Sequence, residues 1–217
     1  MQKTLTVYFD FISPYVYFAW EPLLSLLQKH KVDLNLKPVL FAGLLNAHGS
    51  KGPAEIPAKR TYVLTETLRL GMIHGKKIKS PPTHPFNPLP LLRLCEAVEN
   101  AQDKLKLAIA LSTACWEEGL DLSCEETLVE VANRVGLDGK ELMLKTQAPA
   151  IKEKIKKNTE EALSKGAFGV PSFIVDNQIF WGHDRIGHVD RYLQGKLNVE
   201  NALLNDILAR PRGADRK

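Results

Sequence analysis

Residues 6–16 read TVYFDFISPYV, and this stretch decides the fold. Its first six residues are mostly β-branched or aromatic and predict a buried strand. Ser13 followed by Pro14, directly after a strand, is typical of the N-cap and the first position of a helix. The free backbone amides and the dipole of a helix start favour an anion. The stretch therefore predicts a strand, a turn and a helix whose first turn can hold a negatively charged group beside Ser13.

The same stretch excludes one class of chemistry. Thiol–disulfide exchange needs a thiolate that attacks and a second thiol that resolves the mixed disulfide. A Cys-Pro-x-Cys motif would place these thiols at positions 13 and 16, which are Ser13 and Val16 here. A serine hydroxyl replaces neither thiol, but it can hydrogen-bond the sulfur of a ligand. The alternative, that Ser13 only caps the helix, stays open at this point.

A second segment, near the other end of the chain, complements the first. Residues 168–175 read FGVPSFIV and place Val170-Pro171 at the start of an apolar strand, which a polar turn connects to another strand over residues 178–181. Proline in this position is tolerated as an ordinary trans edge residue. The order strand, Ser-Pro helix, long helical middle, Val-Pro strand, hairpin and final helix is that of a thioredoxin-like fold. In that fold Pro171 is a structural cis-proline that exposes the backbone of Val170 to a ligand.

Composition favours a globular protein without nucleic-acid or membrane partners. The chain has 217 residues, of which 44% are hydrophobic and 25% charged, and its net charge of +4 comes with no basic stripe interleaved with aromatic residues. No signal peptide precedes the first strand, so we expect a cytoplasmic protein. Cys95, Cys115 and Cys124 lie in helical patterns and are expected to be buried, reduced thiols. No spacing of His, Cys, Asp or Glu indicates a metal site.

The chain is expected to form an α/β fold, a thioredoxin-like sheet domain with a large inserted helical subdomain. Residues 1–57 would form the first part of the sheet domain, as a βαβ unit and a loop over residues 41–57. Residues 58–165 would form the helical subdomain, in which Ser123 and Asp138 begin capping boxes and Gly119, Gly136 and Gly166 end helices. Residues 166–217 would complete the sheet domain with two strands and the C-terminal helices.

Five stretches carry a resemblance to known proteins: YFDFISPY at 8–15, GSKGP at 49–53, PAKR at 57–60, FGVP at 168–171 and FWGHDR at 180–185. Together they resemble one family, the glutathione-dependent 2-hydroxychromene-2-carboxylate isomerases and the kappa-class glutathione transferases, both of which have a DsbA-type thioredoxin-like fold. The resemblance implies that glutathione is the cofactor, that a small aromatic acid is the second substrate and that the protein is a homodimer.

The resemblance also assigns residues to glutathione. It implies that Ser13 hydrogen-bonds the sulfur, that the Val170 backbone pairs with the cysteinyl part, and that Asp184 with His183 holds the γ-glutamyl end. Lys59 would face the glycine carboxylate. The remaining predicted contacts are Tyr15, Ser50, Trp181 and Gly182, and the predicted second-substrate pocket contains Phe41, His84 and Phe86.

Some of these residues have alternative explanations or depart from the family pattern. Asp184 is also a good helix N-cap, Trp181 is typical of a core or rim position, and Lys59 fits a solvated helix face. The loop that contains His84 and Phe86 has five prolines and is also explained by rigid packing. Ser50 stands where many relatives have asparagine, and His183 stands where relatives have serine or asparagine.

Three functions compete. The first is a glutathione-dependent cis/trans isomerase that acts by reversible thiolate addition to an aromatic-derived acid. The second is glutathione conjugation, in which the adduct is released. The third is a non-catalytic thioredoxin-fold binding module, which would lack both motif cysteines but would have no need for a thiolate-stabilising serine beside the Val-Pro and Gly-His-Asp-Arg segments.

Overall fold

The computed structural model describes residues 2–213 and is built around one four-stranded sheet with the order β2-β1-β3-β4. β1 (Lys3–Phe9) pairs in parallel with β2 (Val32–Pro38), so the first part of the chain is a βαβ unit as predicted. β1 also pairs antiparallel with β3 (Ser172–Val175), which forms a hairpin with β4 (Gln178–Trp181). Two segments far apart in the sequence thus meet at the centre of the sheet.

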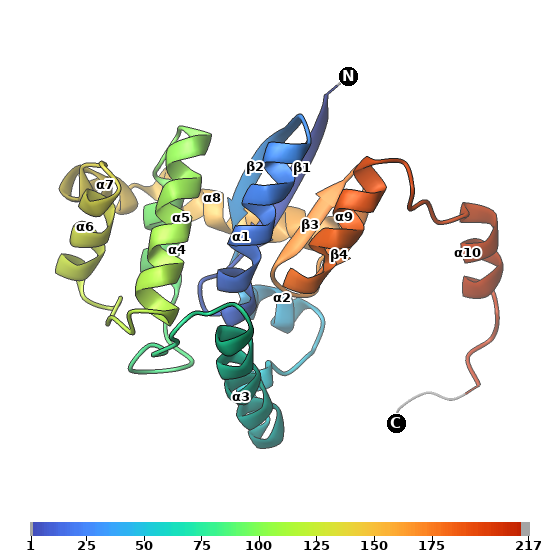
Figure 1. Cartoon of the computed structure of the whole chain (residues 1–217), viewed down its shortest axis with the longest axis horizontal. Coiled ribbons are helices and arrows are strands. Elements are labelled where there is room, and N and C mark those ends of the chain that lie inside the picture. The colour runs from blue at the N-terminus through green and yellow to red at the C-terminus, as the bar shows by residue number, and fades with distance from the viewer. Residues whose placement is uncertain (1, 214–217) are drawn as a thin grey trace.

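Helices cover both faces of this sheet (Figure 1). α1 (Pro14–Lys29) and α9 (Ile186–Leu193) contact each other in front of it, and α8 (Pro149–Ser164) passes behind it against β2 and α2 (Phe41–Ala47). The core between the layers is apolar, because the central strands contribute fully buried side chains to it, including Leu5, Phe9 and Phe173. The structure confirms the thioredoxin-like α/β fold.

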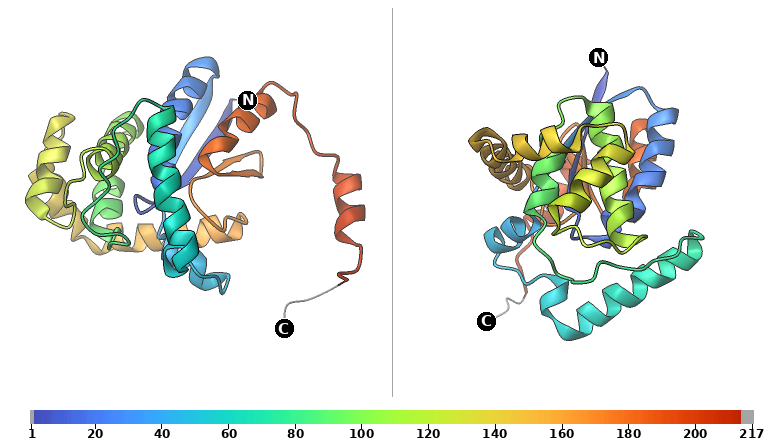
Figure 2. Two further views of the ribbon diagram at one scale, coloured as in Figure 1. Left: turned by 60° about the horizontal axis from the view of Figure 1, so that its bottom comes forward. Right: turned by 90° about the vertical axis from the view of Figure 1, so that its left-hand side faces the viewer.

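The remaining helices lie between β2 and β3 in sequence or follow the sheet (Figure 2). α4 (Leu89–Glu96), α5 (Ala101–Trp116), α6 (Glu125–Arg134) and α7 (Gly139–Thr146) form a group beside the β2 edge. α3 (Pro57–Ile73) crosses the end of the molecule at which α1 begins, and α10 (Asn201–Leu208) stands apart from the body. Two short 3₁₀ helices, η1 (Pro53–Glu55) and η2 (His183–Arg185), complete the described elements. The predicted third segment, 166–217, ends outside the described residues.

Three local expectations were wrong. Residues 41–57 are not a loop, because the apolar residues of α2 bury Leu44 in the core and η1 follows. Ser123 is not a helix cap, because its amide and hydroxyl both donate to Asp121 (3.0 and 2.6 Å) and α6 begins one residue later, at the N-cap Cys124. The third wrong expectation concerns Cys124, which was expected to be buried and is half-buried, whereas Cys95 and Cys115 are buried as predicted.

Other local signals in the helical part are confirmed. Asp138 caps α7 by accepting a hydrogen bond from the Glu141 amide (2.9 Å). Gly119, Gly136 and Gly166 have φ angles of 68°, 81° and 83°, and they follow the ends of α5, α6 and α8. These left-handed conformations favour glycine, which explains why the sequence marks the helix ends so clearly.

A buried polar cluster fastens the helical part to the sheet domain. The Glu96 carboxylate on α4 accepts hydrogen bonds from the Lys104 ammonium (3.3 Å) and from the Asn158 side-chain amide (3.1 Å), and it forms an ion pair with Lys154 (2.6 Å). Asn158 also donates to the Pro38 carbonyl at the end of β2 (3.2 Å). Glu96, Lys104 and Asn158 are all buried, so each depends on the others for its hydrogen bonds.

We expect Glu96→Ala to lower the free energy of unfolding by about 3–5 kcal/mol, because it leaves the buried Lys104 ammonium without its carboxylate partner. Urea unfolding followed by circular dichroism measures the change. The matched control is Glu160→Ala on α8, which removes an exposed i,i+4 pair with Lys156 at 3.9 Å and should change stability by no more than about 0.5 kcal/mol. Equal effects of the two substitutions would contradict the structural role of the cluster.

Candidate active site

Ser13 lies where the end of β1 turns into α1, and it faces the segment before β3. It is the N-cap of α1 with extended backbone angles (φ −94°, ψ 120°), yet its side chain caps no amide of this fully described helix. Its hydroxyl instead points across the sheet end to the Val170 carbonyl oxygen at 3.5 Å, although the two residues are 157 positions apart. The alternative that the Ser13 side chain serves as a helix cap is therefore not supported by the geometry.

Within the described residues, two backbone amides of the segments that meet at Ser13 are left without an acceptor. The amides of Tyr15, in the first turn of α1, and of Val170 donate to no acceptor within residues 2–213. The Val170–Pro171 peptide is cis, and the Val170 side chain is only 6% exposed. Free amides at a helix start attract an anion, and a free amide beside a strand can pair with an extended peptide. The arrangement suits an extended ligand that carries a negatively charged group next to Ser13.

The start of the last helical region packs directly on the first turn of α1. The His183 ring stacks on the Tyr15 ring with centroids 5.3 Å apart and an angle of 9° between the planes, and Phe18 lies at 6.2 Å from His183. Burial among these rings lowers the pKa of His183, so the imidazole is neutral at pH 7. The predicted contacts Tyr15 and His183 are thus brought together, and His183 adds a polar edge without adding a charge.

Asp184 follows in η2, with its carboxylate exposed beside the Arg185 guanidinium (3.2 Å). Neither η2 nor α9, both fully described, has a side-chain cap, so Asp184 does not act as the predicted N-cap. Gly182, two residues earlier, has a φ angle of 109°, a backbone conformation that other residues rarely adopt. Glycine at this position therefore allows the turn that leads from β4 into η2 without backbone strain.

Two exposed aromatic rings lie beside the Val170 segment. Trp181 is 52% exposed and Phe168 is 46% exposed, and their rings meet edge to face at 4.8 Å. Gly169 lies under the Trp181 indole, because a Cβ at this position would be 2.5 Å from Nε1. The Gly182 amide donates to the Pro171 carbonyl (2.9 Å), which fixes the end of β4 against the Val170 segment. Trp181 is therefore a rim residue of the site and not part of the core.

Ser50 follows α2, and Lys59 lies at the start of α3. Ser50 is exposed and donates to the His48 carbonyl (3.4 Å), while the His48 imidazole Nε2 lies 3.2 Å from the Ala167 carbonyl. Lys59 is exposed in the first turn of α3, next to Arg60, whose guanidinium donates to the His84 carbonyl (3.4 Å). Among the described residues, neither Ser50 nor Lys59 bonds to Ser13 or Val170, so the structure leaves their predicted contact with glutathione untested.

The predicted second-substrate residues border the turn before Ser13. The His84 Nε2 atom lies 3.0 Å from the Ile12 carbonyl oxygen, so Nε2 carries the proton that it donates. Burial lowers the pKa of His84 and keeps it neutral. Its ring packs on Trp116 (5.4 Å) and on Phe86 (6.5 Å). Phe41 is half-buried at the start of α2. These contacts hold His84 and Phe86 rigidly, as expected if their proline-rich loop serves packing. Both residues also lie at the edge of the candidate site, where they could contact a second substrate.

Sequence reasoning missed a buried carboxyl group under the site. Asp10 has no exposed surface, and it accepts hydrogen bonds from the amides of Ile12 (3.1 Å) and Phe41 (2.9 Å). It thereby links the turn before Ser13 to the start of α2. Burial raises its pKa to about 7, although the two amide bonds oppose the change. The signal in the sequence was a charged residue inside the apolar run YFDF, which a surface strand would not explain.

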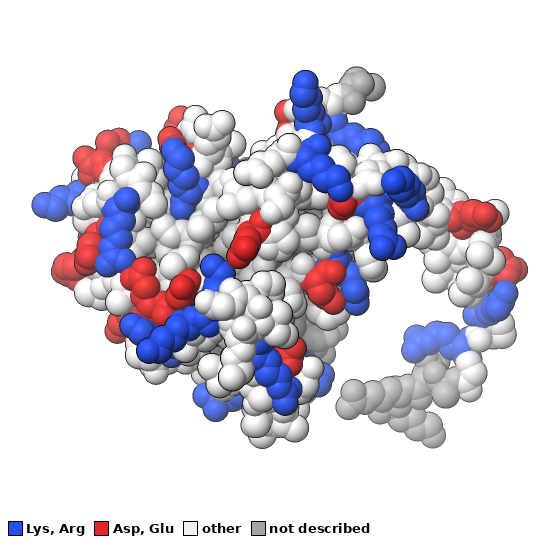
Figure 3. Space-filling model, viewed as in Figure 1, with Lys and Arg blue, Asp and Glu red and all other residues white. Residues whose placement is uncertain are grey.

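On the face shown in Figure 3, Lys and Arg side chains gather over α9 and the start of β1, whereas both signs of charge lie over the helices at the left. In the described part of the chain, His, Cys, Asp and Glu side chains form no group of three that is arranged for a metal ion. None of the helices within residues 2–213 is long and apolar enough to cross a membrane.

Comparisons with known proteins show the family and the fold to which this chain is similar. A family model described as a DSBA-like thioredoxin domain matches residues 4–194. A 2-hydroxychromene-2-carboxylate isomerase from Sphingobium xenophagum is 30% identical over 89% of this chain and 99% of its own length. Glutathione S-transferase kappa 1 from Rattus norvegicus is 25% identical over 85% of this chain and 88% of its own. A solved structure of 2-hydroxychromene-2-carboxylate isomerase superposes with a TM-score of 0.81 at 20% identity, covering 95% of this chain and 100% of that one.

The raised pKa of Asp10 predicts how stability depends on pH. Between the unfolded pKa of 3.8 and the folded pKa of about 7, the folded protein holds a proton that the unfolded chain has lost. The stabilisation is complete below the unfolded pKa and disappears as the pH rises through the folded pKa. The difference corresponds to at most about 4 kcal/mol.

We therefore expect the free energy of unfolding of the wild type to fall relative to that of Asp10→Asn as the pH rises from about 4 to about 8. Urea unfolding at a series of pH values measures this. Because all other titrating groups are shared, the difference between the two proteins isolates Asp10. A difference that stays constant over this range would show that the pKa of Asp10 is not raised.

Proposed function

Because the chain belongs to the DSBA-like thioredoxin domain family, we propose that it is a glutathione-dependent enzyme. Within that family it resembles 2-hydroxychromene-2-carboxylate isomerases and kappa-class glutathione transferases. Its proposed reaction is the isomerisation of a 2-hydroxychromene-2-carboxylate-like aromatic acid. The observation that carries the proposal is the Ser13 hydroxyl. It is not used as a cap, it faces the Val170 carbonyl, and it occupies the position at which a redox enzyme would need a thiol.

The residues around Ser13 fit a tripeptide with charged ends. The free Val170 amide would pair with the cysteinyl backbone of glutathione, and the exposed Asp184 carboxylate would bind the γ-glutamyl ammonium. Neutral His183 would present its ring edge to the same end. Lys59 in the first turn of α3 would face the glycine carboxylate, and Tyr15, Ser50, Trp181 and Gly182 would complete the contacts. These assignments rest on the match of the motifs to the family and on the positions described above.

Bound glutathione would supply a thiolate that adds reversibly to a conjugated carbon of the substrate, so that a double bond can rotate before the sulfur leaves again. The contribution of this chain is to keep the sulfur charged. The Ser13 hydroxyl would donate to the thiolate, and the free Tyr15 amide with the positive end of the α1 dipole would add to it. A hydrogen bond to a charged acceptor contributes about 1.5–3 kcal/mol, and about 1.4 kcal/mol lowers a pKa by one unit. Ser13 alone can therefore lower the thiol pKa by one to two units.

The second substrate would lie between the glutathione sulfur and the residues Phe41, His84 and Phe86. His84 is fixed by its bond to the Ile12 carbonyl, so this wall of the pocket is rigid. The buried Nδ1 atom of His84 has no hydrogen-bond partner within residues 2–213. The homodimer that the resemblance implies and the cytoplasmic location expected from the sequence stay predictions.

A kappa-like conjugation reaction is the second candidate, supported by the relatives that are kappa-class glutathione transferases. Mass spectrometry of the product separates the two reactions. An isomerase returns a product of the same mass as its substrate and leaves the glutathione concentration unchanged, whereas a transferase releases an adduct and consumes glutathione. A binding module would change neither substrate.

We expect Ser13→Ala to raise the pKa of the bound glutathione thiol by about 1.5 units and to lower turnover of 2-hydroxychromene-2-carboxylate about 30-fold, because about 2 kcal/mol of thiolate stabilisation is lost. Glutathione binding should weaken much less, since the hydroxyl acts mainly on the charged sulfur. Thiolate absorbance and initial rates measure the two effects.

The control for this substitution is Ser25→Ala on the same helix, where the exposed hydroxyl donates to the Glu21 carbonyl (3.2 Å). It should change neither quantity. If Ser13→Ala behaves like Ser25→Ala in both measurements, Ser13 has no role in the chemistry and the proposed mechanism is wrong.

We also expect Asp184→Asn and Lys59→Ala to weaken glutathione binding about fivefold each, because each removes one exposed charge contact of roughly 1 kcal/mol. Isothermal titration calorimetry measures the affinity. Asp206→Asn on α10 and Lys157→Ala on α8 are exposed controls of the same charge and should leave the affinity unchanged. Unchanged affinity in both Asp184→Asn and Lys59→Ala would place glutathione elsewhere on the protein.

A further inference from the structure

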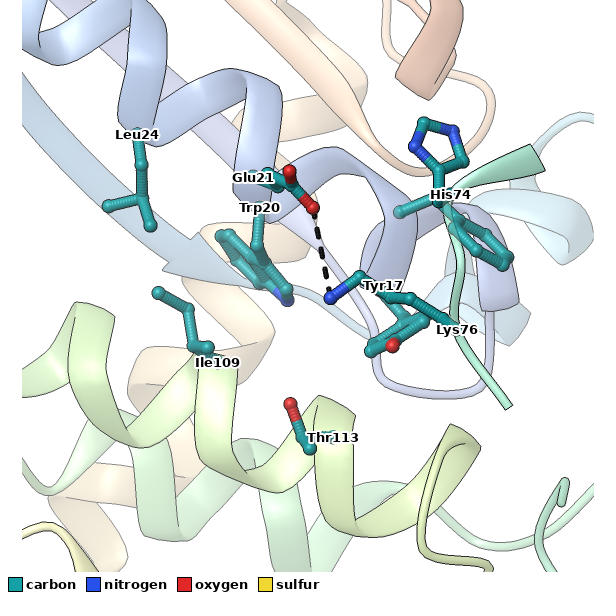
Figure 4. Close-up of a pocket in the computed structure, with 9 residues that line it drawn as sticks. Tyr17, Trp20, Glu21, Leu24, His74, Lys76, Ile109 and Thr113 are labelled. Carbon is teal, nitrogen blue, oxygen red and sulfur yellow. Dashed lines mark ion pairs between the residues drawn. The ribbon is translucent and has the colours of Figure 1, made fainter. Parts of the chain in front are cut away.

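A cavity of about 270 Å³ lies between α1 and α5, beyond the residues assigned to glutathione (Figure 4). Tyr17, Trp20 and Leu24 line it from α1, Ile109 and Thr113 line it from α5, and Lys76 reaches it from the segment after α3. At about 1.5 Å per helical residue, Tyr17 and Leu24 lie roughly 6 and 16 Å along α1 from Ser13. The Tyr17 end of the cavity is thus about one turn of α1 from Ser13, and its Leu24 end extends away from Ser13 along the helix.

The aromatic walls of the cavity are fixed in place. The Tyr17 hydroxyl donates to the Glu117 carboxylate (2.5 Å), and the Trp20 indole N–H donates to the Ser112 hydroxyl (2.8 Å). Both polar atoms are thus tied to α5 and the segment after it, and the rings border the cavity with apolar surface. Figure 4 shows Tyr17, Trp20 and Ile109 converging on the space between the helices, with the Thr113 hydroxyl pointing into it. Such walls suit a flat, apolar ring.

A weak ion pair lies at the edge of the cavity. The Lys76 ammonium is 3.7 Å from the Glu21 carboxylate and 5.9 Å from the centre of the Tyr17 ring. The side chains of Lys76 and Glu21 are 34% and 69% exposed, and ion pairs of this kind contribute little to stability. The more exposed Glu21 can swing into solvent, which leaves the Lys76 ammonium beside the ring to receive an anion.

From these features we propose that the cavity is a binding site for a small planar aromatic carboxylate. Its ring would lie between Tyr17, Trp20 and Ile109, and its carboxylate would replace that of Glu21 at Lys76. Pockets for drug-sized ligands span about 300–1,000 Å³, so a cavity of about 270 Å³ fits a molecule of one or two rings. The proposal uses none of the residues assigned to glutathione and does not depend on the proposed function.

Titration of the full-length protein with 4-fluorobenzoate, followed by ¹⁹F NMR, tests the site. Lys76→Met should weaken binding about tenfold because it removes the cation, and Glu21→Gln should tighten it several-fold because it removes the competing carboxylate. Thr113→Phe should abolish binding by filling the cavity, with thermal unfolding as the check that it folds. The matched control is Lys77→Met, which removes an exposed charge one residue away and should have no effect.

The directions in which these substitutions change the affinity distinguish an anion site from a cation site. The same titration with 4-fluorobenzylamine serves as the opposite probe, and preferential binding of this amine, weakened by Glu21→Gln, would make the cavity a cation site and overturn the proposal. Absence of 4-fluorobenzoate binding, or binding that Lys76→Met and Thr113→Phe leave unchanged, would also overturn it. Ser13→Ala should leave 4-fluorobenzoate binding unchanged, so failure of the glutathione proposal does not affect this result.

Discussion

The antiparallel pairing of β1 with β3 is the constraint on which the candidate site depends. Its register pairs Tyr8 with Ser172, so the residues that follow β1 and those that precede β3 emerge at the same end of the sheet. Ser13 and Val170 meet at this end because both are close in sequence to the paired ends of β1 and β3. A shift of one residue in this register would turn the side chains of β3 to the opposite face. The apolar core on both faces of the central strands therefore fixes the position of Ser13 relative to Val170.

The helical part of the chain contributes to the site and is not only an insertion that the sheet tolerates. Two of its side chains hold successive carbonyl oxygens of the turn before Ser13, because the Trp116 indole donates to Phe11 (3.0 Å) and the His84 imidazole to Ile12. Asp10 holds the amide side of the same turn. With donors and acceptors both satisfied, the turn is rigid, and the Ser13 hydroxyl is presented from a fixed backbone. The buried cluster around Glu96 joins the helical part to β2 and so keeps this arrangement in register with the sheet.

Much of the fold could be predicted because the signals were local. Pro14 after Ser13 marks a helix start, alternation marks the strands, and Asp176 and Asn177 adopt positive φ angles of 49° and 64° in the predicted hairpin turn.

The wrong predictions concern segments whose structure depends on tertiary contacts. α2 contains Gly43 and Asn46, which disfavour a helix, and it forms because Leu44 is buried in the core. Ser123 donates its hydroxyl to Asp121 and so does not cap α6. In the site, the sequence indicated Tyr15 and His183 separately, but their stacking and the neutral state of His183 follow only from packing. The burial of Asp10 had a local signal, the charged residue inside the apolar run YFDF. The cavity at Tyr17 has no such signal, since it lies between elements distant in the chain.

Loss of the two motif thiols changes what the same backbone can do. In a dithiol enzyme the amides at the helix start stabilise a thiolate that belongs to the protein itself. Here they face a hydroxyl, which is neutral at all physiological pH values, so any anion at this place must come from a ligand. Cys115 cannot substitute, because burial raises the pKa of its thiol, and burial raises that of Cys95 to about 12. The electrostatic preference of the α1 start is therefore retained while its covalent chemistry is lost. Under the proposed function glutathione is such a ligand, because it brings the sulfur that the sequence SPYV lacks.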